Sequence, residues 1–438
     1  MKPPVRLAAA LLCGAVLLSV VSCSDPASVG TELGPDSLSG GDPEIQSIVP
    51  SSLDTARVPP LTGFAGSPLG QDRTWRFLAG QVDDPLAGPI EADGYIDFFG
   101  SENRPSTFQD LPASAFNVEL RLRQSYLHGD TTSTLAVQLY DLDGNADMAR
   151  APADTTFASE MAPVRPETYS VAPTDTLVAL SLPDAWVEEH IATLKDSARF
   201  DDGSFDGFRL TTTSGDAVVG YEHGTATLRM TSESDTVDFQ VEKTFTHVER
   251  GQPPDDLAED RLLLQDGAGV GLSMAWTDGG IDSLADANVL LNRAQISVPV
   301  DTSLLRPPEG SDFVRPLPSG YRLLATRAET EGTPSCAALQ LFQLPQRPGQ
   351  CIFPTVPQWV PVAARPVADR TFPVFDRWFV DRAPLSRFRM EITARASSSP
   401  SGRETALRGI PSTTPVVIRT DAPSKEALPR AILTVTPL

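Results

Sequence analysis

The sequence predicts an all-β fold made of two tandem β-sandwich domains of jelly-roll type. Its 40 prolines are scattered along 438 residues, which disfavours long helices and favours short strands joined by turns. Apolar and polar residues alternate over residues 116–123, as expected for a strand with one face toward solvent. A hydrophobic content of 40% and a charged content of 21% are typical of a folded chain.

Residues 1–22 are typical of a lipoprotein signal peptide. Lys2 and Arg6 precede the apolar run Leu7–Val21, which is short for a membrane-spanning helix and has the length of a signal-peptide apolar region. Cys23 stands where this run meets a polar chain, after two valines and a serine. These residues resemble the lipobox of bacterial lipoproteins, which are cleaved before the cysteine and acylated on its sulfur. An ordinary secretory signal or an uncleaved anchor is the alternative interpretation.

Acylation of Cys23 would determine the location of the protein. Each buried methylene of an acyl chain contributes about 0.8 kcal/mol, so two or more chains give stable anchoring. We therefore expect a lipid-anchored protein of the cell envelope, held in the outer membrane by palmitate-like chains. Both the periplasm and the cell surface stay open as the side that it faces.

The rest of the chain divides into a tether and two domains. Residues 23–72 are rich in Ser, Pro, Gly and Asp, and are predicted to form a flexible tether. Strand-like segments follow over residues 73–248, the first predicted domain, with one helix expected over residues 182–194. The stretch ERGQPPDDLAED marks a boundary, after which the strand pattern begins again over residues 249–438. A single large sandwich is the alternative to this tandem.

The cysteines agree with an exported protein. Cys13 leaves with the signal peptide and Cys23 is acylated, which leaves Cys336 and Cys351 as a pair. In an oxidising compartment such a pair favours a disulfide, which would stabilise the fold by about 3 kcal/mol in the chain-entropy model. A metal site is the alternative, but no His lies near the two cysteines.

The charge of the chain limits its partners. A net charge of -22 disfavours nucleic acid and anionic membrane surfaces. The partners that we expect are the membrane, through the acyl chains on Cys23, and a glycan or another envelope protein. No cofactor is predicted.

The segment Leu262–Trp276 (LLLQDGAGVGLSMAW) invites comparison with a nucleotide-binding loop. A dinucleotide fingerprint needs a strand, the glycines and then a helix, whereas residues 272–283 are too quickly broken by glycines to form one. The last glycine of the motif is also replaced by Leu272. We interpret the segment instead as two strands bent at glycines.

Two further segments are weaker candidates for binding sites. DLDGNAD places oxygen-bearing side chains at alternate positions, as at the start of a calcium loop, but the expected glycine and the closing glutamate are absent. An acidic turn is the favoured interpretation, with a candidate calcium set of Asp141, Asp143, Asn145 and Asp147. The aromatic stretch TFPVFDRWFVDR is the best candidate for stacking on a glycan, through Phe372 and Trp378, although a buried strand explains it better.

Catalytic motifs are missing. The four histidines are far apart in sequence and show no metal-ligand spacing, and no GxSxG motif is present. Carboxylates are abundant enough to supply a glycosidase pair by chance. The sequence therefore predicts a binding or structural protein that is not an enzyme, with a hydrolase or carbohydrate-binding accessory protein acting on polysaccharide as the alternative.

Several short motifs resemble those of the domain-of-unknown-function 4270 lipoproteins. After the acylated Cys, the signature "G-x-(D/E)-L-x-P-(D/E)" is matched by Gly30, Glu32, Leu33, Pro35 and Asp36. The segment "G-x-x-x-D-P-x-x-G" is matched by Gly80, Asp84, Pro85 and Gly88. "Q-x-x-A-G-V" and "N-(K/R)-A-x-(L/I)" are matched by Gln265, Ala268, Gly269, Val270, Asn292, Arg293, Ala294 and Ile296.

This resemblance covers nearly the whole mature chain, with a departure over residues 306–351, which contain the cysteine pair. It implies an envelope lipoprotein of mostly β structure. It implies no catalytic residue, because the family has no assigned activity.

Overall fold

The computed structural model describes residues 42–57, 76–100, 104–142, 162–196, 205–252, 259–265, 270–276, 280–307, 309–317, 320–327, 342–344, 347–352, 358–361, 367–368, 388–395 and 413–438. In these residues the chain is mostly antiparallel β structure, so the predicted all-β fold is confirmed. The longest helix among them, α2 (Asp184–Lys195), lies where one helix was expected.

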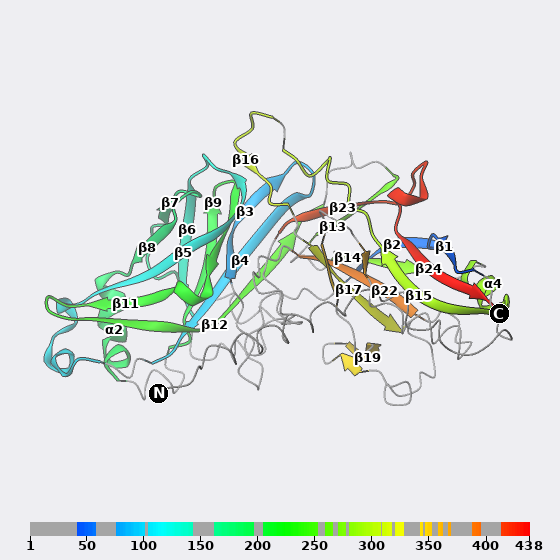
Figure 1. Cartoon of the computed structure of the whole chain (residues 1–438). Coiled ribbons are helices and arrows are strands. Elements are labelled where there is room, and N and C mark those ends of the chain that lie inside the picture. The colour runs from blue at the N-terminus through cyan, green and yellow to red at the C-terminus, as the bar shows by residue number, and fades with distance from the viewer. Residues whose placement is uncertain are drawn as a thin grey trace, which may run out of the picture.

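The described strands form three sheets (Figure 1). The largest has eleven strands, β3 (Arg76–Asp84), β4 (Gly88–Phe98), β5 (Asn117–Asp130), β6 (Leu135–Asp141), β7 (Tyr169–Val171), β8 (Leu177–Ser181), β9 (Phe208–Ser214), β10 (Ala217–Glu222), β11 (Thr227–Thr231), β12 (Thr236–Arg250) and β16 (Phe313–Val314). Because β12 pairs with both β11 and β4, this sheet closes on itself and encloses a core.

The second half of the chain supplies most of the other two sheets. The nine-stranded sheet contains β2 (Ser52–Arg57), β13 (Arg261–Gln265), β14 (Val270–Ala275), β17 (Gly320–Arg327), β18 (Phe342–Leu344), β19 (Arg347–Ile352), β20 (Gln358–Pro361), β22 (Phe388–Arg395) and β23 (Pro415–Arg419). The four-stranded sheet has the order β1 (Glu44–Ile48), β24 (Arg430–Pro437), β15 (Val289–Ser297) and β21 (Val367–Ala368).

Short helices complete the described chain: η1 (Ser106–Asp110), η2 (Ala113–Ala115), η5 (His223–Thr225), α4 (Gly280–Asp286) and η8 (Lys425–Ala427). None of the helices in the described ranges is long and apolar enough to span a membrane.

The segment expected to be a flexible tether differs from that expectation over residues 44–57. β1 pairs with the C-terminal strand β24, and β2 pairs with β14. Both partners are distant in sequence, so local composition does not reveal these strands. β12 ends at Arg250, near the predicted boundary at residue 249, while the division into two domains stays a prediction.

Two hydrophobic cores lie on opposite faces of β3. Phe77 and Ala79 point into the core inside the large sheet, which we call the sandwich core. Leu78 and Val82 point the other way, into a second cluster that includes Leu263, Leu305 and Val417 from the second half of the chain. We call this second cluster the joint core, because it packs the two halves against each other. Burial on both faces explains why RFLAG shows no polar alternation.

A bulge in β5 directs residues into the joint. Val118 and Leu120 belong to the sandwich core, as the alternation in the sequence predicts. The pairing with β10 then skips Ser125, an extra residue that moves the following side chains to the opposite face. Tyr126 therefore belongs to the joint core, and His128 on the same face is completely buried.

The glycine-containing segment Leu262–Trp276 forms the predicted strand pair. Gln265 of β13 pairs with Val270 of β14 in antiparallel register, and a strand follows the glycines where a nucleotide-binding loop needs a helix. This confirms the interpretation as two strands.

Candidate functional site

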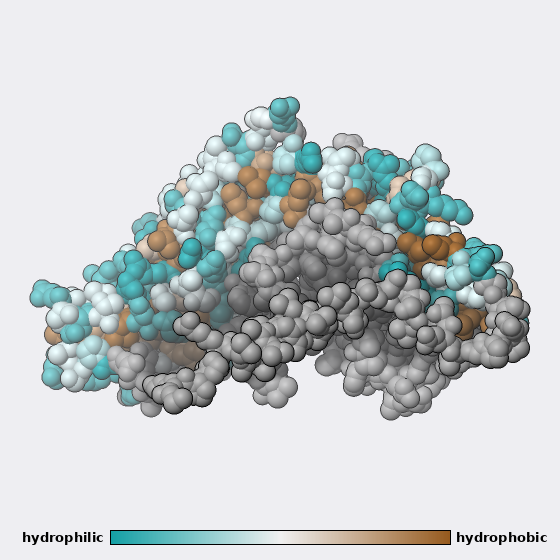
Figure 2. Space-filling model, in the orientation of Figure 1, coloured by the Kyte–Doolittle hydropathy of each residue, from teal (hydrophilic) through white to brown (hydrophobic). Residues whose placement is uncertain are grey.

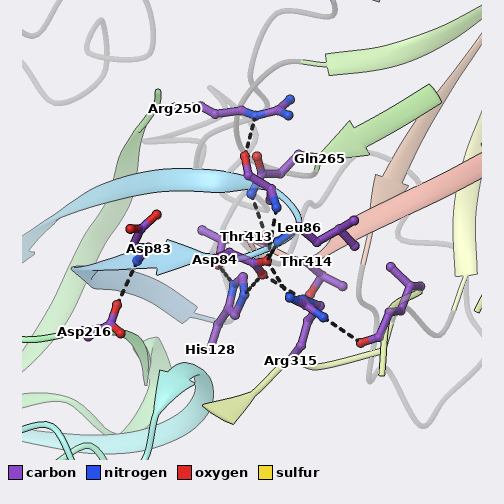
Figure 3. Close-up of polar contacts among 12 residues, drawn as sticks. Asp83, Asp84, Leu86, His128, Asp216, Arg250, Gln265, Arg315, Thr413 and Thr414 are labelled. Atoms are coloured by element: carbon purple, nitrogen blue, oxygen red, sulfur yellow. Dashed lines mark hydrogen bonds and ion pairs between the residues drawn. The ribbon is translucent and has the colours of Figure 1, made fainter. Parts of the chain in front are cut away.

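The joint core contains a buried ionic network centred on Asp84, at the end of β3 (Figure 3). Arg315 binds its carboxylate with both prongs of the guanidinium, Nε to Oδ2 at 2.8 Å and Nη2 to Oδ1 at 2.5 Å. His128 Nε2 donates to Oδ2 at 2.6 Å. The backbone N–H groups of Leu86 and Ala87 donate to Oδ1 at 2.7 and 3.1 Å. Five donors thus satisfy one carboxylate, as a buried charge requires.

These contacts determine the charge of Asp84. Burial alone would raise the pKa of the Asp84 carboxyl, but the hydrogen bonds and charges of His128 and Arg315 outweigh it and hold the pKa well below its ordinary value. The carboxylate is therefore ionised and can only accept hydrogen bonds, so His128 Nε2 must carry a proton.

The network extends to the second half of the chain through residue 413. Thr413 Oγ1 lies 2.7 Å from His128 Nδ1, and its backbone N–H donates to Tyr126 Oη at 3.1 Å. Gln265 Nε2 donates to the carbonyl of Thr413 at 2.9 Å. Arg315 Nη1 also donates to the carbonyl of Leu305 at 3.1 Å. Strands β3 and β5 of the large sheet are thereby linked to three segments of the second half.

Thr413, His128 and Asp84 place a hydroxyl, an imidazole and a carboxylate in a row. These are the three chemical groups of the catalytic triad in a nucleophilic hydrolase. Asp84, His128 and Thr413 are each 0% exposed, so a substrate has no access to the hydroxyl. Asp84 is also neutralised by Arg315, whereas the carboxylate of such a triad must stabilise a charged imidazole. The arrangement therefore links the two halves of the chain in the joint core.

An open groove with a volume of about 610 Å³ lies beside this network. Its walls come from the β3–β4 hairpin, the turn at residues 215–216 and the end of β12, and are lined by Gln81, Val82, Asp83, Pro89, Ile90, Glu91, Gly215, Asp216, Glu249, Arg250 and Gly251. Asp216 Oδ1 accepts the backbone N–H of Asp83 at 2.8 Å and so fixes one wall (Figure 3). Four carboxylates and one guanidinium make the groove acidic.

Two groups in the groove have perturbed pKa values. Burial, together with the nearby charges of Asp93 and Glu249, raises the pKa of the Glu91 carboxyl above its ordinary value. Glu91 and Glu249 are direct partners in the register of β4 and β12. Burial lowers the pKa of Arg250, whose Nε donates to the carbonyl of Ala87 at 3.3 Å in the wall between the groove and the network.

Asp141 is the one member of the predicted calcium set that lies in the described residues. Its Oδ2 accepts a hydrogen bond from Trp186 Nε1 at 2.6 Å and lies 3.0 Å from His190 Nε2. This oxygen therefore fixes helix α2 against β6. Asp143, Asn145 and Asp147 lie outside the described residues, and within the described part of the chain no three His, Cys, Asp or Glu side chains group as a metal site.

The other predicted site residues are mostly outside the described chain. This holds for Cys23, Cys336, Phe372 and Trp378, while Cys351 lies in β19. The acylation, the disulfide and the glycan-stacking site thus stay predictions.

Sequence reasoning missed the residues of the network. Asp84 and Gln265 carry a signal, because both lie in the motifs that resemble the lipoprotein family, but those motifs indicate a relationship and not a contact. His128 and Arg315 carry none, since each is far in sequence from Asp84.

Comparison with known proteins adds little. No family model matches the chain, and no curated protein matches it, so the resemblance to the domain-of-unknown-function 4270 lipoproteins stays a prediction. Among solved structures, a candidate secreted protein from Parabacteroides distasonis aligns with 7% identity and a TM-score of 0.22, covering 89% of this chain and 99% of that chain. A TM-score this low supports no inference about fold or function.

Proposed function

We propose that the protein is a lipid-anchored lipoprotein of the cell envelope whose β-sheet body is a non-catalytic binding or structural module. The anchoring part of the proposal rests on the sequence, where Cys23 follows the apolar run Leu7–Val21. We place it in the outer membrane, facing the periplasm or the cell surface.

One observation carries the non-catalytic part. The hydroxyl of Thr413, the imidazole of His128 and the carboxylate of Asp84 lie in a row and are buried, and the carboxylate is paired with Arg315. The open acidic groove, in contrast, is accessible to a ligand. An acidic groove with one guanidinium suits recognition of a ligand with several hydrogen-bond donors, such as a glycan or a basic segment of another envelope protein.

A polysaccharide hydrolase is the second candidate, and Glu91 is the observation that favours it. A carboxyl with a raised pKa opposite a second carboxylate is what glycoside hydrolysis uses as general acid and partner. In the module that we favour, the same pair binds without turnover.

A glycan and peptide binding screen on the purified protein separates these functions. The parent should bind without consuming the ligand, and E249Q should weaken binding, because it removes an exposed carboxylate of the groove. The matched control is E233Q, which makes the same change at an exposed glutamate in the turn between β11 and β12, outside the groove, and should bind like the parent. Product release that is abolished by E91Q would overturn the non-catalytic proposal in favour of the hydrolase.

Anchoring has an independent test. C23A should move the protein from the membrane to the soluble fraction of fractionated cells, because the acceptor sulfur is gone. Unchanged membrane retention of C23A would contradict the lipoprotein proposal and leave the groove experiment unaffected.

A further inference from the structure

The four-stranded sheet has one buried face and one face that is open over part of its area. On β24, Ala431, Leu433 and Val435 point inward and are buried, while the alternate residues Ile432 and Thr434 are half-buried. We call the side of Ile432 and Thr434 the outer face.

The open part of the outer face lies toward the end of β24. Gln295 and Ser297 of β15, which pair with the first residues of β24, are buried. Ile45 pairs with Thr434, and Leu290 pairs with Thr436, so both lie on the outer side farther along the strand, and Leu438 follows the end of β24. Their exposed fractions are 73% for Ile45, 53% for Leu290 and 70% for Leu438.

Large apolar side chains are thus concentrated on a small area. Ile45, Leu290 and Leu438 are three of the seven exposed large apolar residues in the described chain. Figure 2 shows apolar surface in the region where Figure 1 places β1 and β24. A group of exposed apolar side chains marks a surface that contacts something other than water.

The charge of the outer face is opposite to that of the chain. The registers place Arg293 beside Thr434 on the outer side, whereas Arg430 lies at the covered end, beside the buried Ser297, and donates to the carbonyl of Lys425 at 3.0 Å. No Asp or Glu side chain falls on the outer side in these paired positions of β1, β24 and β15, although the chain as a whole has 57 acidic residues and a net charge of -22. Exposed apolar side chains beside an arginine suit a lipid surface with phosphate groups.

The position of the lipid anchor relative to this face identifies the occupant. β1, which carries Ile45, begins at Glu44, and 20 residues separate Glu44 from Cys23. A chain of that length spans at most about 70 Å when fully extended. Acyl chains on Cys23 would therefore hold β1 within about 70 Å of the bilayer, and at the resulting effective concentration of lipid a weak contact of the outer face is sufficient.

We propose that the outer face of the four-stranded sheet lies on the lipid bilayer that holds the acyl chains. Ile45, Leu290 and Leu438 enter the boundary between headgroups and acyl chains, and Arg293 lies at the level of the lipid phosphates. This inference rests on the proposed lipoprotein function.

The test uses the full-length acylated protein in phosphatidylcholine vesicles, with and without brominated acyl chains. L290W places a fluorescent reporter on the outer face, and L177W places one at an exposed leucine on β8 of the large sheet, where it is 75% exposed in the parent. Relative to the parent, L290W should show a blue-shifted emission that brominated lipids quench, and L177W should show neither change.

Flotation of the same vesicles separates this inference from the function on which it rests. Failure of the parent to float, or equal flotation of C23A, contradicts the lipoprotein proposal. Flotation of L290W without a blue shift or quenching overturns only the membrane-contact proposal. A blue shift of C23A/L290W in buffer without lipid, together with a doubled molecular mass, would also overturn it, because the outer face would then bind a second copy of the chain.

Discussion

Replacing Arg315 by methionine should strongly destabilise the protein. The substitution keeps much of the apolar volume of the side chain and removes the two guanidinium contacts to Asp84, at 2.8 and 2.5 Å. The carboxylate, which is 0% exposed, would keep only His128 and two backbone N–H groups as donors. Removing one partner of a buried ion pair costs about 3–5 kcal/mol, because the remaining charge stays buried without its counter-charge.

Urea unfolding of R315M at neutral pH measures this loss. The matched control is R229M, because Arg229 binds Asp238 with the same two-pronged geometry, at 2.6 and 2.7 Å, but both side chains are about one third exposed. Exposed pairs contribute about 0–1 kcal/mol, so R229M should unfold close to the parent. The double variant D84N/R315M should recover much of the loss, since it removes the stranded charge. An R315M stability within about 1 kcal/mol of the parent would refute the assignment of the network as the joint.

The remaining predictions concern pH, backbone strain and the cysteines. Burial opposes the charged form of His190, but Asp141 and the carbonyl of Trp186 outweigh it and raise the pKa of His190 above 6.5. The contact should therefore stabilise the protein fully below about pH 6.5, and this stabilisation should be lost as the pH rises through the higher pKa of the folded state. A series of thermal melts should show a pH dependence of stability that H190A reduces, and an unchanged dependence in H190A would contradict the prediction. G80A should destabilise the protein by more than about 1 kcal/mol, because Gly80 has φ +140° and an added Cβ would meet the carbonyl oxygen of Ala217 at 2.2 Å. The control G224A should be close to neutral, because nothing lies within 4 Å of an added Cβ there, and equal melting temperatures for the two variants would refute the steric explanation. Cys336 and Cys351 should resist alkylation until a reductant is added, whereas immediate labelling of both would exclude the predicted disulfide.

Local patterns in the sequence were enough to predict several of the strands and one helix. The alternation around Val118 and Leu120 predicted a strand with one buried face, and both side chains are buried in the sandwich core. The segment after Pro183 predicted the helix that the structure has as α2. These elements depend on periodicity within a few residues, which the sequence displays directly.

The joint could not be predicted in the same way, because it depends on contacts between distant residues. Asp84 and Arg315 are 231 positions apart, and no periodicity connects them. The bulge at Ser125 changes which face His128 occupies without any glycine or proline to mark it. β1 and β2 were missed for a related reason, since their partners β24 and β14 lie in the second half of the chain.

The residues that follow Asp84 carry a local signal for the turn that they form. An aspartate before proline, with a glycine four residues later, is typical of a tight turn whose carboxylate binds nearby N–H groups. The structure has this turn, with Asp84 accepting from Leu86 and Ala87 and with Gly88 at φ +79°. The contact of Asp84 with Arg315, which is 231 positions away, depends on the three-dimensional fold and has no local sequence signal.

Mass spectrometry of the N-terminal peptide of the protein purified from membranes tests the central claim most directly. The lipoprotein account predicts a mature chain that begins at Cys23 and carries a diacylglycerol on its sulfur, with the mass of two or more acyl chains. A mature chain that begins at another residue, or an unmodified Cys23, would contradict the anchoring and with it the placement of the β-sheet body on the membrane.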